Sequence, residues 1–268
     1  MGEDRQDQIG SGEGFSFAEV QEAKRYLYDA MTIGEKLLIS GAEVSRVEDT
    51  ISRICRAYGA ERVDVFSITS SIVVTIHGAA FGTVTQTRRV LGMQYDMHRL
   101  EMLNQLSREI CAHVLKTPEL ERRLKEIEGE KEYPFPVLVF AYGLISAAFS
   151  VLFGGSLLDA VASALIGFSL KPAQRELKRM QINTLLSSFV CSVAGGLLAV
   201  LLVRLGLGQS VDKINIGNIM LLIPGVAMTN GIRDMFNGDM VSGLIRFFEA
   251  LLIAVSLALG FVFITSRM

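Results

Sequence analysis

Four polar side chains follow a Pro-Gly pair near the C-terminus. The stretch reads LLIPGVAMTNGIRDMFNGD, residues 221–239, and these side chains are those of Asn230, Arg233, Asp234 and Asp239. Pro224 removes a backbone donor and Gly225 permits a bend, so an apolar helix should break there. A broken helix exposes amides and carbonyls that a transporter can direct at carboxylate and ammonium groups. The stretch therefore predicts a solute contact, a gate or partner contact, or a plain loop at a membrane edge.

Other polar side chains interrupt the apolar sequence around this stretch. Asp159 and Glu249 are ionisable, and Asn218 is a neutral companion. An ionisable group at membrane depth costs about 2.5 to 3.5 kcal/mol on insertion scales and usually faces a partner or an aqueous cavity. We therefore predict that these three residues line a path for solute and protons, together with the four polar residues of the broken segment.

The composition divides the chain into a polar half and an apolar half. Half of all residues are hydrophobic and only 20% are charged, which is too apolar for an ordinary soluble protein of 268 residues. Of 26 Lys and Arg and 28 Asp and Glu, residues 134–268 contain only 9 and 6. The net charge of −2 and the lack of a basic face argue against nucleic acid as a partner.

Five stretches of the apolar half are candidates to cross a hydrocarbon core about 30 Å thick. They cover residues 135–155, 156–170, 183–203, 214–229 and 241–265. The loop KPAQRELKR after the second stretch carries four basic residues, and such loops stay in the cytoplasm. The sequence predicts an α-helical polytopic membrane domain over residues 134–268, with the preceding half cytoplasmic and the C-terminus external.

The polar half, residues 17–133, is predicted to fold as a small α+β domain behind a disordered tail, residues 1–16. Apolar residues recur at helical spacing between residues 27 and 58, and Ser40 followed by Glu43 fits a capping box at the start of a second helix. The stretches RVDVFSITSSIVVTIHG and GTVTQTRRV indicate two or three strands that turn at residues 77–82. Residues 96–115 and 118–128 return to helical spacing.

Catalytic and metal-binding patterns are not found in the sequence. The histidines lack the spacing of metal ligands, and no nucleotide-binding motif is present. We predict no cofactor, no metal site and no enzyme activity. One alternative is a membrane-anchored enzyme, which would need His77, Asp96 and His98 to converge in one pocket. Another is a regulatory or scaffold subunit that assembles through the helix beginning near Glu43.

Several motifs together resemble the threonine/serine exporter family over about residues 19–265. They are GAEVSRVEDTISRICRAYG, SITSSIVVTI, the five spans and LLIPGVAMTNGIRDMFNGDMVSGLIRFFEALL. The segment after the fourth span is the most specific of these motifs. The segment with Gly41 and Glu43, followed by Glu48, is the second.

The resemblance implies a secondary exporter of small hydrophilic metabolites, such as threonine and serine or a dicarboxylate such as succinate. It also implies a location in the lipid bilayer of a bacterial inner membrane. We expect proton coupling because Asp159 or Glu249 could carry the proton and no nucleotide-binding motif offers another energy source. Single-chain members carry a second membrane domain after the portion seen here. We therefore expect a separate small membrane protein as a partner, and a homo-oligomer remains open.

Overall fold

The computed structural model describes residues 16–130 and 133–266, so the predicted disordered tail lies almost wholly outside the described residues. The chain divides into two compact units. The first unit comprises the residues up to 130 together with residues 233–243, and the second comprises residues 131–232 and the chain from residue 244.

The first unit combines helices with a small antiparallel sheet. Its elements are α1 (Phe17–Ile39), α2 (Val44–Ala57), β1 (Arg62–Ile68), β2 (Ser71–Gly78), β3 (Gly82–Arg89), α3 (Met97–Ala112) and α4 (Thr117–Glu128). The strand order is β1-β2-β3, and Gly78 pairs with Gly82 across the turn. The prediction of two or three strands turning near residues 77–82 and followed by two helices is confirmed.

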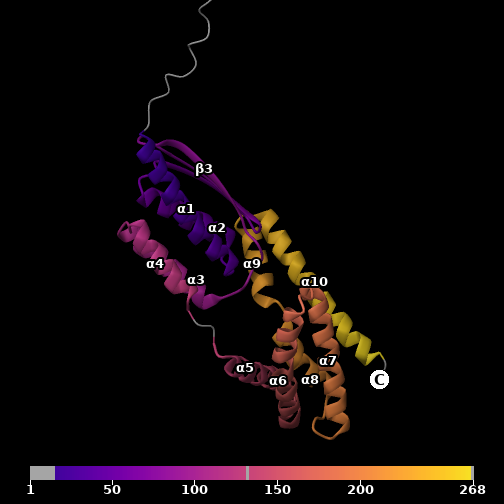
Figure 1. The fold of residues 1–268 in the computed structure, drawn as a ribbon. Coiled ribbons are helices and arrows are strands. Elements are labelled where there is room, and N and C mark those ends of the chain that lie inside the picture. The colour runs from indigo at the N-terminus through magenta and orange to yellow at the C-terminus, as the bar shows by residue number, and fades with distance from the viewer. Residues whose placement is uncertain (1–15, 131–132, 267–268) are drawn as a thin grey trace, which may run out of the picture. The chain divides into compact units, whose positions relative to one another are not determined.

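The α1 and α2 helices form the middle layer of the first unit. They contact the sheet on one side and α3 on the other, and α4 packs against α1 and α3 (Figure 1). The core consists of aliphatic side chains from all three layers, including the fully buried Leu27, Ile51, Ile72 and Leu103. The helical stripe of apolar residues in the sequence is therefore the face that this core buries.

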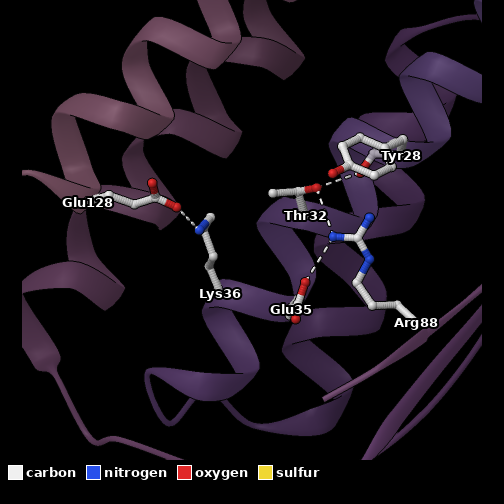
Figure 2. A network of polar contacts seen from close by, with 6 residues as sticks. All are labelled: Tyr28, Thr32, Glu35, Lys36, Arg88 and Glu128. Carbon is white, nitrogen blue, oxygen red and sulfur yellow. Dashed lines mark hydrogen bonds and ion pairs between the residues drawn. The ribbon is translucent and has the colours of Figure 1, made fainter. Parts of the chain in front are cut away.

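A polar network joins α1 to β3 and to α4 (Figure 2). Arg88 of β3 lies 2.9 Å from Glu35, donates to Thr32 Oγ1 at 3.1 Å, and places its guanidinium 4.5 Å from the centre of the Tyr28 ring. Lys36 pairs with Glu128 of α4. The Arg88 and Glu35 side chains are mostly covered, so this pair is screened less than a surface pair.

The capping box predicted for Ser40 and Glu43 is wrong. Ser40 is the C-cap of α1. The amides of Gly41 and Ala42 donate to the carbonyls of Leu38 and Leu37, which is the Schellman pattern. Gly41 has φ +99°, and a Cβ there would lie 2.5 Å from the Tyr95 ring. The local pattern was misread because this motif ends one helix before Glu43 begins the next.

The second unit is a helical bundle. Its helices are α5 (Phe135–Leu152), α6 (Leu157–Arg179), α7 (Thr184–Arg204), α8 (Val211–Leu222), α9 (Gly225–Phe236) and α10 (Met240–Thr265), of which α9 and α10 each have one end in the first unit. The α5, α6 and α8 helices contact one another, and α7 contacts α6 and α8. The break between α8 and α9 falls at Pro224, as expected from a residue that cannot continue the hydrogen-bond ladder.

Three or four segments of the described chain are long and apolar enough to cross a bilayer. They are α5, α7 and α10, with the α8–α9 pair as a fourth if its two helices, bent by 55°, are one span. The second predicted span lies in α6, which is not among these segments, so the count of five is not reached. In α5 only 17% of the most apolar window is buried. Such exposed apolar surface indicates contact with lipid.

Candidate functional site

A buried group of hydroxyl and amide side chains lies between three helices of the second unit. Ser146 of α5, Ser163 of α6 and Asn218 of α8 each have 0% exposure, and we call these three residues the bundle cluster. Ser146 Oγ donates to Asn218 Oδ1 at 2.6 Å and lies 2.8 Å from Ser163 Oγ. Polar side chains cost free energy in an apolar bundle unless they are paired, so these bonds join the three helices.

The surroundings of the bundle cluster contain polar atoms that are not satisfied. Ser150 Oγ and Asn215 Oδ1 are buried and have no hydrogen-bond partner within the described residues. Gly217 lets α8 approach closely, because a Cβ there would lie 2.5 Å from Ser163 Oγ and 2.6 Å from the Ser146 carbonyl. Unsatisfied buried polar atoms are rare in proteins and call for water or a bound polar group.

Asp159 lies at the beginning of α6 and accepts four hydrogen bonds. Its Oδ2 accepts from the amide and hydroxyl of Ser156 in a capping box, and its Oδ1 accepts from the amides of Gln209 and Ser210 at 2.7 and 2.9 Å. The carboxylate therefore ties the start of α6 to the loop before α8. These bonds hold together the starts of α6 and α8, two helices that carry the bundle cluster, and the place of Asp159 in the solute and proton path stays a prediction.

The remaining polar residues predicted for the solute path divide between the two units. Asn218 is in the bundle cluster, and Asn230 is half-buried in the part of α9 that belongs to the second unit. Glu249 lies on α10 with its side chain exposed. Arg233, Asp234 and Asp239 belong to the first unit.

The end of α9 packs against the start of α2 in the first unit. The Val44 amide donates to Asp234 Oδ1 at 3.1 Å, Arg233 pairs with Glu43, and Asn237 Nδ2 donates to Ser45 Oγ at 3.2 Å. Asp234 has 0% exposure. The Glu43 side chain does not cap α2. Asp234 therefore supplies the acidic cap that a helix N-terminus favours, from 190 residues away along the chain.

Glu48 connects the same helix to the sheet. Its Oε1 accepts from the amide of Ser67 at 2.7 Å and from the Ser67 hydroxyl at 3.0 Å. Burial raises the pKa of Glu48, the two Ser67 bonds oppose that rise, and the charge of Asp239 adds to it. The motif with Glu43 and Glu48 and the motif with Asp234 are far apart in the sequence. They contact each other in the first unit through the bonds of Arg233 and Asp234 to the start of α2.

The three residues of the enzyme alternative each have a different partner. His77 Nδ1 of β2 lies 3.1 Å from Thr83 Oγ1, Asp96 accepts from the Arg99 amide to cap α3, and His98 lies 3.9 Å from Glu130. Within residues 16–130 and 133–266, no group of three or more His, Cys, Asp or Glu side chains could hold a metal ion.

Sequence reasoning identified Asn218 but missed its partner Ser146, and it missed Ser163, which bonds Ser146. A signal was present, because small hydroxyl side chains inside otherwise apolar spans often join helices. Ser146 and Ser150 are four residues apart and so share one face of α5. The sequence pattern does not reveal which other helix that face meets.

Apolar helices with exposed surfaces and a buried polar cluster between them define a multi-pass helical membrane protein. A family model described as "Putative threonine/serine exporter" matches residues 29–268. The chain therefore belongs to the threonine/serine exporter family, which is a family of transporters, and the resemblance noted in the sequence is confirmed.

Individual relatives have related descriptions. The "Probable succinate transporter subunit YjjP" of Escherichia coli K12 is 28% identical over 84% of this chain and 88% of its own length. Its counterpart from Klebsiella aerogenes is 27% identical over 84% and 87%. The "Threonine/serine exporter" of Corynebacterium glutamicum is 24% identical over 86% of this chain and 49% of its own length. No solved structure matches the chain.

Proposed function

We propose that this chain is a subunit of a secondary exporter that moves small hydrophilic metabolites out of the cytoplasm. The observation that carries the proposal is the bundle cluster, since Ser146, Ser163 and Asn218 place hydroxyl and amide groups inside an apolar bundle. The unsatisfied Ser150 Oγ and Asn215 Oδ1 near them leave hydrogen-bonding capacity for a polar solute. We place the solute path along these side chains of α5, α6 and α8.

The chemistry of the cluster favours a hydroxy-amino acid such as threonine or serine as the solute. Its side chains are neutral donors and acceptors, which suit a solute that has a hydroxyl, an ammonium and a single carboxylate. A dicarboxylate such as succinate is the second candidate. It is favoured by the two similar proteins named as subunits of a succinate transporter, which match most of this chain.

We also propose a partner membrane protein. The two relatives matched over nearly their whole length are named subunits. Glu249 supports the same proposal, because an exposed carboxylate on the apolar helix α10 is costly against lipid and would be stabilised against another protein chain. We infer that a proton gradient drives export and that Glu249 carries the proton at that contact. A homo-oligomer is the competing arrangement.

The location that we propose is a bacterial inner membrane, with the first unit in the cytoplasm. Lys171, Arg175, Lys178 and Arg179 at the end of α6 support this orientation, because basic residues near span ends are retained on the cytoplasmic side.

Solute efflux from cells tests the proposed function. Cells that lack this chain should retain more labelled serine or succinate after loading than cells that have it. Restoring the chain should restore efflux. Unchanged efflux of both solutes in the deletion strain would overturn the assignment.

A further inference from the structure

The first unit contains a pocket of about 380 Å³, apart from the bundle cluster of the second unit. This volume lies within the roughly 300 to 1,000 Å³ typical of small-molecule sites. One face of α1 contributes Glu19, Glu22, Tyr26 and Leu27, and the other walls come from the end of α2, from β2 and from the turn before β3.

Aromatic and aliphatic side chains form the body of this pocket. The rings of Tyr26 and Tyr58 stack with centroids 4.2 Å apart and an interplanar angle of 15°, and Phe81 lies in the turn. Leu27 and Ile76 are buried. The Tyr58 hydroxyl donates to the Leu115 carbonyl at 2.8 Å, which fixes that ring. The walls therefore offer a preformed apolar and aromatic surface.

The charge of the pocket is negative only. Among the described residues that line it, Glu19 and Glu22 are the charged ones, and neither forms an ion pair with another described residue. The Tyr26 hydroxyl donates to Glu22. Two basic residues, Lys24 and Arg25, follow Glu22 closely in the sequence. Neither lines the pocket, and Arg25 pairs with Glu121 of α4 at 4.0 Å. The carboxylates are thus available to a cation.

Both tyrosines of the pocket have a raised pKa. The hydrogen bond to Glu22, burial and the charges of Glu22 and Asp29 raise the pKa of Tyr26 to about 12, against the opposing charge of Arg25. Burial and the charge of Asp29 are the leading causes that raise the pKa of Tyr58 to about 12. Both phenols therefore stay protonated and neutral, and their rings keep the electron-rich faces that attract cations.

We propose that this pocket binds a small organic ammonium compound with an apolar body. The ammonium group lies between Glu19 and Glu22, and the apolar body packs on Tyr26, Tyr58 and Phe81. A carboxylate in the ligand would find no cation among the described lining residues. The site therefore rejects dicarboxylates and holds amino acid zwitterions poorly, which separates it from the proposed solute path.

Binding of phenethylammonium to the full chain in lipid nanodiscs tests the proposal by calorimetry. We expect saturable binding, and about tenfold or greater weakening when the ammonium is replaced, as in 2-phenylethanol or phenylacetate. The double variant Glu19→Gln with Glu22→Gln should weaken phenethylammonium binding by about the same factor. The matched control, Glu119→Gln with Glu126→Gln on α4, removes two exposed carboxylates outside the pocket and should leave binding unchanged.

Three results would overturn the proposal. Equal binding of the alcohol and the ammonium would show an apolar site in which charge plays no part. Equal binding to the wild type and to the Glu19 and Glu22 double variant would place the ammonium elsewhere. Lack of saturable binding at millimolar concentrations would remove the site. Phe81→Ala provides a second variant that should weaken the ammonium compound without changing the charge. None of these measurements uses solute flux, so failure here leaves the exporter proposal standing.

Discussion

Asp234 shows how one side chain can serve a helix distant in sequence. It is fully buried, and its Oδ1 accepts from the Val44 amide at the first residue of α2. From the sequence, Asp234 was expected at a solute path, at a gate or in a membrane-edge loop. In the structure Asp234 lies on α9 with its carboxylate against the first turn of α2, and its charge favours that helix terminus. A cap supplied from 190 residues away leaves no local pattern for sequence analysis to find.

We predict that Asp234→Ala loosens the first turn of α2. Loss of a helix cap typically costs about 1 kcal/mol, or about a fivefold increase in local opening. Hydrogen exchange of the amides at residues 44–47 in the full chain measures this effect. Glu101→Ala, which changes an exposed residue of α3, is the control and should leave these rates unchanged. Protection of α2 that is identical in Asp234→Ala and the wild type would show that the cap contributes no stability.

The raised pKa of Glu48 leads us to predict that the stability of the first unit depends on pH. Burial raises its pKa above the usual 4.5, so the folded state binds this proton more tightly than the unfolded state does. The stability of the unit should therefore fall as pH rises above 4.5 through the raised pKa. Glu48→Gln keeps an oxygen that can accept from Ser67 but cannot ionise. The variant should therefore not show the loss of stability that ionisation of Glu48 causes. Exchange of β1 amides across the pH range measures it, and equal pH slopes in both proteins would contradict the assignment.

Helix contacts in the second unit depend on glycines at specific places. Alanine in a helix is intrinsically about 1 kcal/mol more favourable than glycine. At Gly217 a new Cβ would lie 2.5 Å from Ser163 Oγ and 2.6 Å from a backbone carbonyl, whereas at Gly195 its nearest neighbour would lie 3.8 Å away. Gly217→Ala should therefore destabilise the bundle by about 1 to 3 kcal/mol, and Gly195→Ala should be neutral or stabilising.

Thermal unfolding of the two glycine variants in the same detergent checks this difference. A lowered midpoint is expected for Gly217→Ala alone. Equal midpoints for the two variants would mean that α8 does not approach α5 and α6 as closely as the structure places it.

Element types followed from the sequence more readily than their boundaries and partners did. Dense Val, Ile and Thr and a glycine turn identified the strands, and long apolar runs identified α5, α7 and α10, because these signals are local. The start of α2 was misread, since Ser40 ends α1 in a Schellman motif before Glu43. Span 156–170 was predicted from its apolar residues, but α6 continues to Arg179 with a basic end.

At the scale of the whole molecule, the candidate site was predictable only in part. Asn218 was noticeable because an amide is unusual in an apolar run. Serines such as Ser146 and Ser163 are common in helices, and only packing reveals that Ser146 bonds both Asn218 and Ser163. The two motifs that carried the family resemblance include Glu43 and Arg233. These side chains pair in the first unit, a contact that neither motif predicts by itself.

The number of spans determines on which side of the membrane the C-terminus lies. We still predict five spans and an external C-terminus. Alkaline phosphatase fused after residue 268 should be active if the end is external, whereas a green fluorescent protein fusion should be dark after export by the general secretory route. Fusions after residue 179, at the basic end of α6, should give the opposite pattern. A cytoplasmic C-terminus would mean an even number of spans, as with four.

Reconstituted flux tests the central claim that the bundle cluster lines the solute path. Proteoliposomes containing the chain and its proposed partner would be loaded with labelled serine or succinate, and efflux would be compared between Ser146→Ala and Ser256→Ala. Ser256 is the matched control, because its hydroxyl donates to the Leu185 carbonyl at 2.6 Å, outside the cluster. We predict that Ser146→Ala slows efflux by about tenfold or more at equal protein content, whereas Ser256→Ala transports like the wild type. Equal efflux by both variants would contradict the account.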